Sequence, residues 1–178
     1  MSSMLLPLVQ ATENYNMIRI VLNIALYQSI WFLSVLGGNK GAWAGLLLLV
    51  IHLAQSRCRV VDIKTMTLVL FIGLLVDGIL QQIGFFSFRV PGFPIPFWLM
   101  VIWLGLGITL HHSLSWLKTQ PLLSMLFGAL GGPAAYWAGA RLGASTFNWP
   151  LPTSLLVLAL IWALLFPAIM LWTVKIKK

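Results

Sequence analysis

One stretch decides the fold of this chain: Leu68-Val-Leu-Phe-Ile-Gly-Leu-Leu-Val-Asp77-Gly-Ile-Leu-Gln-Gln-Ile-Gly-Phe-Phe86. A helix over these residues is roughly 28 Å long, close to the about 30 Å hydrocarbon core of a bilayer. Asp77 stands in its middle and is the only carboxylate in any apolar segment of the chain. An ionised Asp at the centre of a spanning helix costs roughly 2.5–3.5 kcal/mol, so we expect it to face the interior of a helix bundle.

The composition supports an integral membrane protein. The chain has 178 residues, of which 60% are hydrophobic and only 8% charged, and its polar segments are too short for a separate soluble domain. Residues 1–178 are therefore predicted to form a single membrane-embedded domain without an evident repeat. The net charge of +8 comes from scattered Lys and Arg, which indicates contact with anionic lipids and not with nucleic acid.

The sequence predicts an all-α bundle of six transmembrane helices. Charged residues and Pro or Gly turns bound six apolar stretches, at about 18–36, 42–56, 66–86, 96–112, 121–142 and 152–174. Backbone groups find no other partners in lipid, so each stretch that crosses must be helical. The second stretch is short, about 22 Å as a helix, and a re-entrant segment is its alternative.

The distribution of basic residues predicts the orientation. Eight Lys and Arg lie on the side of the N-terminus, at Arg19, Arg57, Arg59, Lys64, Lys118, Lys175, Lys177 and Lys178, and three on the other, at Lys40, Arg89 and Arg141. The positive-inside rule then places both termini in the cytoplasm.

Asp77 shares a helix face with small and polar residues. Gly73, Asp77 and Gln81 recur at intervals of four, and Gly84 lies close to the same stripe. One interpretation is a packing seam in which Asp77 bonds to Asn23 or Gln28 of the first span. The other is a titrating carboxyl group in a cavity, and both place Asn23, Gln28, Asp77 and Gln81 in the interior.

Three histidines fall near the predicted cytoplasmic ends of their spans. His52, His111 and His112, with Ser113 beside them, form a candidate polar group at the inner interface. Adjacent helical residues point about 100° apart, so His111 and His112 cannot easily serve one ion. No other acid is evident to support such ligands. We therefore predict neither a metal nor a cofactor.

The fifth stretch is rich in glycine and contains a proline. Gly128 with Gly132, and Gly139 with Gly143, form two G-x-x-x-G pairs, which predict close helix packing within one subunit or across a dimer. Pro133 is expected to bend or break this helix. A broken helix rich in glycine is also how transporters line a binding site.

Several enzyme classes are excluded by counting residues. Three histidines are too few for a histidine-box oxygenase, and Glu13, Asp62 and Asp77 cannot hold the metals of a phosphate-transfer enzyme. The chain has neither a P-loop nor a nucleophile elbow.

Two segments carry a resemblance to a known family. His112-Ser-Leu-Ser-Trp-Leu117 and Gly128-Ala-Leu-Gly-Gly-Pro-Ala-Ala-Tyr-Trp-Ala-Gly-Ala-Arg-Leu-Gly-Ala144 resemble the bacterial inner-membrane family catalogued as domain of unknown function 2878, and Pro96-Phe-Trp-Leu-Met-Val-Ile-Trp103 fits the same pattern. The resemblance covers nearly the whole chain. It implies a small multi-span protein of the inner membrane, found near genes for fatty-acid-modifying enzymes, and it assigns no catalytic residue.

Together these features favour a protein that binds, moves or presents a lipid or small amphiphile, with a lipid-modifying enzyme or a second copy of the chain as partner. A structural or assembly subunit is the alternative. A membrane enzyme that uses Asp77 or His112 as acid or base is the third hypothesis.

Overall fold

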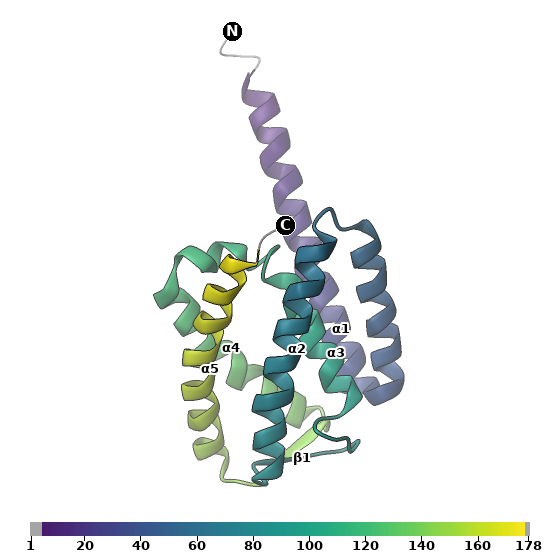
Figure 1. Ribbon diagram of the computed structural model, residues 1–178, viewed down its shortest axis with the longest axis vertical. Coiled ribbons are helices and arrows are strands. Elements are labelled where there is room, and N and C mark those ends of the chain that lie inside the picture. Colours follow the sequence, from purple (N-terminus) through teal and green to yellow (C-terminus); the bar gives the residue numbers. More distant parts are fainter. Residues whose placement is uncertain (1–4, 177–178) are drawn as a thin grey trace.

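The computed structural model describes the backbone of residues 5–176 and the side chains of residues 16–176; Glu13, Lys177 and Lys178 lie outside these ranges. Its elements, in chain order, are α1 (Leu5–Gln55), α2 (Arg59–Gln82), β1 (Phe86–Phe88), α3 (Phe97–Thr109), the 3₁₀ helix η2 (Ser115–Thr119), α4 (Pro121–Arg141), β2 (Ser145–Phe147) and α5 (Leu151–Lys175). The helices form one bundle, and the β strands lie at the end opposite the C-terminus (Figure 1).

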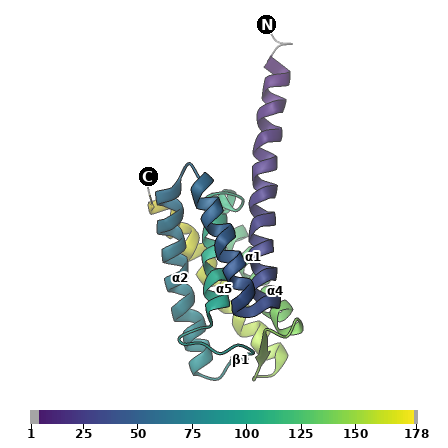
Figure 2. The same ribbon diagram turned by 90° about the vertical axis from the view of Figure 1, so that its right-hand side faces the viewer.

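α1 is two helices joined at a sharp turn. Gly38 has φ 56° and ψ −141°, a left-handed conformation that costs a glycine little and any other residue much. The legs before and after it run side by side in opposite directions (Figures 1 and 2). The turn separates the two apolar stretches predicted at 18–36 and 42–56, and Lys40 lies just beyond it.

α3 is the central helix of the bundle. It packs against both α1 and α2, and nearly all of its residues are buried. With only 13 residues it is shorter than the predicted span at 96–112. Its helical part reaches roughly 20 Å, so the extended segment before Phe97 and the turns after Thr109 continue its path. Irregular backbone is tolerated at membrane depth when protein surrounds it.

The two short strands were not predicted from the sequence. β1 and β2 pair antiparallel, with Ser87 opposite Thr146 at the centre of the register. Each strand follows a helix that ends at a glycine with positive φ, Gly84 at 68° and Gly143 at 77°. In both helix ends the residue after the glycine donates its N–H to a carbonyl five residues back, which satisfies an orphan acceptor.

The β ribbon joins two similar halves of the chain. No repeat was evident from the sequence. The segments α2–β1–α3 and α4–β2–α5 correspond at a spacing of 59 residues, which equates Gly84 with Gly143 and Ser87 with Thr146. Because the strands pair antiparallel about Ser87 and Thr146, the halves are related by an approximate two-fold axis through the ribbon. The sequence concealed this because few residue identities are shared.

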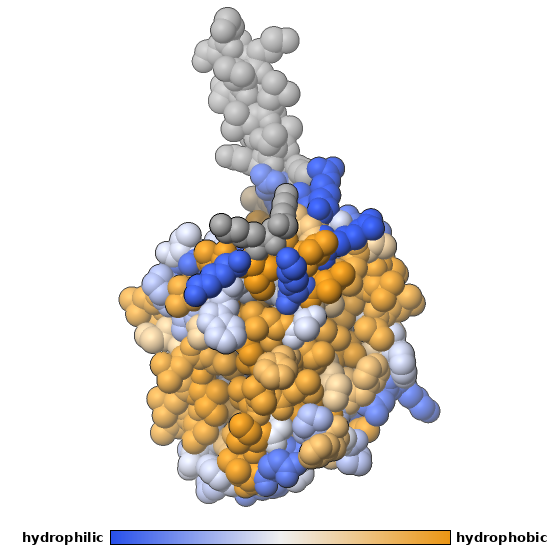
Figure 3. All heavy atoms as spheres, viewed as in Figure 1, coloured by the Kyte–Doolittle hydropathy of each residue, from blue (hydrophilic) through white to orange (hydrophobic). Residues whose placement is uncertain are grey.

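The surface has the properties of a membrane protein. A hydrophobic band covers the middle of the visible face, and hydrophilic residues gather at its two ends (Figure 3). Large apolar side chains are exposed on the helices, as at Leu130 and Leu164, which are 72% and 73% exposed. Asn16–Gln55, Arg59–Gln82 and Leu151–Lys175 are long and apolar enough to cross a membrane. The chain is a multi-pass membrane protein.

Candidate functional site

Asp77 lies at the junction of three helices. Its carboxylate is fully buried and accepts two hydrogen bonds, from Trp103 Nε1 on α3 at 2.8 Å and from Tyr136 Oη on α4 at 2.6 Å. Both oxygens are therefore partnered. A carboxylate satisfied in this way ties α2 to α3 and α4, and removal of the acid leaves two buried donors without an acceptor.

The other residues expected beside Asp77 lie elsewhere. Asn23 lies near the C-terminal end of α3, where its Oδ1 accepts from the backbone N–H and the hydroxyl of Ser113. Gln81 is half-buried and donates to the carbonyl of Gly92, and Gln28 lines a cavity described below. The expected bond from Asp77 to the first span is absent because aromatic donors on α3 and α4 occupy both of its oxygens.

Two stacked tryptophans continue this junction. The rings of Trp103 and Trp162 lie 5.4 Å apart at an angle of 12°. Gly73 faces the Trp103 ring and Gly132 faces the Trp162 ring, and a Cβ at either position would overlap the indole. Gly73 and Gly132 are 59 residues apart in the sequence, as are Trp103 and Trp162, and also Asp77 and Tyr136. Each pair therefore occupies equivalent positions in the two halves, which places the junction on the approximate two-fold axis. Its centre is built from equivalent positions of the two halves.

The glycines of α4 have different roles. Gly128 and Gly132 lie against Trp162 and Phe166 of α5, so this G-x-x-x-G pair packs within the subunit. Gly143 instead ends the helix, and a Cβ at Gly139 meets no atom within 4 Å. Within the subunit, Gly139 and Gly143 therefore do not form the expected packing pair: Gly139 leaves open space and Gly143 ends the helix.

α4 is continuous from Pro121 to Arg141, so of the two expectations for Pro133, a bend or a break, the break is wrong. A proline in a helix interior loses only its own N–H bond and crowds the carbonyl four residues earlier. Pro133 is itself buried and follows two glycines, which impose few steric demands on the preceding turn. Pro167 likewise lies within an unbroken α5.

A large cavity lies between α4 and the first leg of α1. It has a volume of about 620 Å³ and an overwhelmingly apolar lining. α4 packs mainly on α5, and α1 mainly on α3, so no close helix pair fills the space between them. Its walls include Trp31, Trp98, Trp103, Trp162, Phe166 and the open position at Gly139. Tyr136, which bonds to Asp77, also reaches this cavity.

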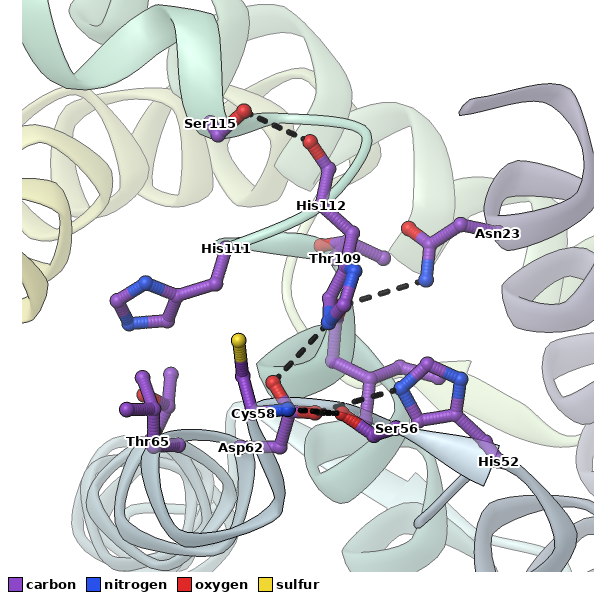
Figure 4. A network of polar contacts seen from close by, with 12 residues as sticks. Asn23, His52, Ser56, Cys58, Asp62, Thr65, Thr109, His111, His112 and Ser115 are labelled. Carbon is purple, nitrogen blue, oxygen red and sulfur yellow. Dashed lines mark hydrogen bonds and ion pairs between the residues drawn. The ribbon is translucent and has the colours of Figure 1, made fainter. Parts of the chain in front are cut away.

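A second polar centre lies at the other end of α2, around Asp62. Its side chain is fully buried, and Ser56 Oγ donates to Oδ2 at 2.5 Å. His112 Nε2 lies 3.1 Å from Oδ1, and His52 Nε2 lies 3.7 Å from Oδ2. The two imidazole rings meet edge to face at 5.1 Å. Figure 4 shows both histidines directed toward the carboxylate from different segments of the chain.

His111 does not join this cluster. Its Nδ1 lies 2.7 Å from Lys118 Nζ, while its neighbour His112 turns toward Asp62. Burial lowers the pKa of Lys118 to about 8, so the ammonium group loses its proton more readily than an ordinary lysine. Of the histidines and Ser113 grouped from the sequence, the structure brings only His52 and His112 onto a shared partner.

Asp62 was not predicted from the sequence as the shared partner of His52 and His112. The residue lies outside the predicted apolar stretches, among Arg57, Arg59 and Lys64, where an acidic residue is expected to be a solvent-exposed loop residue. α2 begins at Arg59 and not near Met66, so Asp62 belongs to the first turn of the helix and faces inward. Tyr136 and Trp103 were also missed as partners of Asp77, because no spacing rule pairs residues of different helices.

The chain was compared with known proteins. No curated protein and no solved structure matches it significantly. Residues 20–168 match the model of the family described as "Protein of unknown function (DUF2878)". The match covers most of the chain, including the Asp77 junction, the cavity and the Asp62 cluster, and the chain therefore belongs to this DUF2878 family.

Proposed function

We propose that this protein binds the apolar portion of a membrane lipid or another small amphiphile in the cavity between α1 and α4. The volume and lining of the cavity carry the proposal: about 620 Å³ with a mostly apolar lining is suited to an acyl chain or similar group. Such a space inside a membrane-embedded bundle is directly accessible to molecules dissolved in the bilayer.

The few polar groups of the lining support an amphiphilic ligand. Thr109 and Ser113 lie at the end near the histidines, and Ser145 lies at the end near the β ribbon. Gln28 and Tyr136 add two further polar groups, and apolar side chains make up most of the remaining lining. A ligand with a polar head and an apolar tail would satisfy both parts of this surface.

The proposed placement is six crossings of the bacterial inner membrane, with both termini in the cytoplasm. Three observations support it: the two legs of α1 are antiparallel, the start of α1 and the end of α5 lie toward the same end of the molecule, and the basic residues favour that end (Figure 1). The cavity then runs along the bilayer normal beside the central helix.

A structural subunit is the competing function, and the fully bonded state of Asp77 favours it. A carboxylate whose oxygens are both occupied by side-chain donors acts as a lock between helices. The two functions differ in what they predict for the cavity, because a structural lock requires no ligand there.

Filling the cavity tests the proposal. Gly139 lines the cavity and a Cβ there meets no neighbouring atom, so we expect the side chain of Gly139→Leu to occupy part of the cavity. Gly37→Leu is the matched control, since its Cβ also meets no atom within 4 Å and the residue does not line the cavity. Native mass spectrometry of the protein released from mild detergent measures the bound amphiphile directly.

We expect the wild-type protein and Gly37→Leu to retain an amphiphile from the membrane, and Gly139→Leu to retain at least about tenfold less. Equal retention by all three proteins, or none by the wild type, would contradict the proposal. Comparative lipidomics of a strain lacking the gene then identifies the class of ligand.

A further inference from the structure

We propose that His52, Asp62 and His112 form a binding site for a divalent transition-metal ion of the zinc type. The three residues come from the second leg of α1, from the start of α2 and from the turn after α3. One ligand atom from each lies within 4.8 Å of the other two. This site is separate from the cavity function proposed above.

The distances suit a metal centre. Zinc binds imidazole nitrogen and carboxylate oxygen at about 2.0–2.2 Å, so ligand atoms around one ion lie roughly 3–4 Å apart. His112 and Asp62 are separated by 3.1 Å, and His52 and Asp62 by 3.7 Å. The nitrogens of His52 and His112 lie within 4.8 Å of each other, so side-chain movements of up to about 1 Å bring all three ligand atoms onto one ion.

His52 supplies an independent observation in favour of a ligand. Its Nε2 is buried, is directed toward the carboxylate and has no hydrogen-bond partner. The 3.7 Å separation is too long for a hydrogen bond to Asp62. A buried imidazole nitrogen without a partner is costly, and a metal ion would satisfy it.

Asp62 is held in place for such a role. Ser56 Oγ donates to one carboxylate oxygen, and the Ser56 hydroxyl in turn accepts the backbone N–H of Cys58 at 3.0 Å. Supporting hydrogen bonds of this kind orient a metal ligand and raise its affinity. The carboxylate is also fully buried, so an ion bound to it would be shielded from the surrounding water.

The donor set defines the class of ion. Two imidazoles and one carboxylate suit Zn²⁺, Co²⁺ or Fe²⁺, whereas Mg²⁺ and Ca²⁺ prefer oxygen ligands. Three protein ligands leave at least one coordination position open to water or to another molecule. The expectation that no metal binds rested on the directions of His111 and His112 and on the lack of a supporting acid, and Asp62 is that acid.

Metal binding by the purified full-length protein in detergent tests the site. Protein stripped with a chelator is titrated with Zn²⁺ and analysed for bound metal, and Co²⁺ serves as a spectroscopic probe of the coordination geometry. The variants are His52→Ala, Asp62→Asn and His112→Ala. His111→Ala is the matched control, because it removes the adjacent imidazole that contacts Lys118 and not Asp62.

We expect one ion per chain for the wild type and for His111→Ala, and affinity at least tenfold weaker for each of the other three. Bound Co²⁺ should show the visible absorption of a low-coordinate site. His52→Gln replaces His52→Ala if the latter fails to elute as a single species in size-exclusion chromatography. Absence of stoichiometric Zn²⁺ from the wild type would overturn the site, as would an equal loss in His111→Ala.

Discussion

Asp77 shows how a buried acid is accommodated in an apolar helix. Its two oxygens accept from Trp103 and Tyr136, and both donors are placed by helices other than its own. The helical spacing of the sequence was sufficient to place Gly73 and Asp77 on one face, and both are buried. The identity of the partners depended on how α3 and α4 pack against that face.

The hydrogen bonds of Asp77 predict a small loss of stability for one substitution and a large loss for another. Asp77→Asn keeps an acceptor for Trp103 and donates its amide N–H to the Tyr136 oxygen, so only the Tyr136 hydroxyl proton loses its acceptor and we expect a loss of about 1 kcal/mol of stability. Asp77→Leu leaves both donors buried without partners, at a cost of about 1–3 kcal/mol each. Denaturant unfolding in detergent, followed by circular dichroism, measures the difference.

Tyr136→Phe provides a control for this pair, because it removes one donor and leaves the carboxylate in place. Its loss of stability should lie between those of the two Asp77 variants. If Asp77→Leu were as stable as Asp77→Asn, the proposed lock between the helices would be refuted.

Among the elements, α4 combines two kinds of glycine on one helix. Gly132 lies under the indole of Trp162, while Gly139 opens onto the cavity. The sequence shows both residues in the same G-x-x-x-G pattern, so it predicts the same packing role for each. Their roles diverge because Gly132 lies directly against Trp162 of α5, whereas a Cβ at Gly139 would meet no atom within 4 Å and the residue lines the cavity.

Alanine substitutions separate the two roles. Gly132→Ala forces a methyl group into the Trp162 ring near its attachment to the backbone, and overpacking of this kind costs about 1–3 kcal/mol. Gly139→Ala meets no atom and improves helix propensity by up to about 1 kcal/mol. Thermal unfolding of the purified proteins should therefore shift in opposite directions, and shifts of the same sign would contradict the assignment.

How well each helix, strand or turn could be predicted depends on how clear its sequence pattern is. Long apolar runs bounded by charges located most helix ends to within a few residues. The exceptions are the start of α1, which is helical from Leu5, and the start of α2, whose polar first turn carries Asp62. Strands of three residues, as at Phe86–Phe88, are too short for a periodic pattern. The glycines between the stretches at 18–36 and 42–56 predict a turn, and the positive φ of Gly38 shows why a glycine is placed there.

At the scale of the whole molecule, two similar halves meet at a junction that neither completes alone. The Asp77–Tyr136 bond and the Trp103–Trp162 stack both join α2–β1–α3 to α4–β2–α5. α1 has no counterpart in this pairing and packs mainly on α3. The cavity therefore lies where the added helix fails to fill the space beside the second half. Sequence spacing alone does not reveal this arrangement, because it results from three-dimensional packing.

The proposed six crossings predict which residues are accessible from each side of the membrane. With Cys58 replaced by serine, single cysteines are introduced at the exposed positions Lys40, Lys64, Ser87 and Lys175. A membrane-impermeant maleimide applied to intact spheroplasts should label the variants at Lys40 and Ser87. Those at Lys64 and Lys175 should react only after permeabilisation, because they lie at the end favoured by basic residues.

The variant at Lys40 decides between a crossing and a re-entrant second leg. The leg that follows Gly38 is helical to Gln55 and reaches roughly 25 Å, short of the about 30 Å core, so its crossing requires local thinning of the bilayer or snorkelling by Lys40. If the leg crosses, Lys40 and Lys64 label from opposite sides. Labelling of both from the same side would show that the leg returns without crossing, and the number of crossings would then be odd. The antiparallel legs of α1, with the basic cluster of Arg57 and Arg59 at the far end of the second, lead us to expect opposite sides.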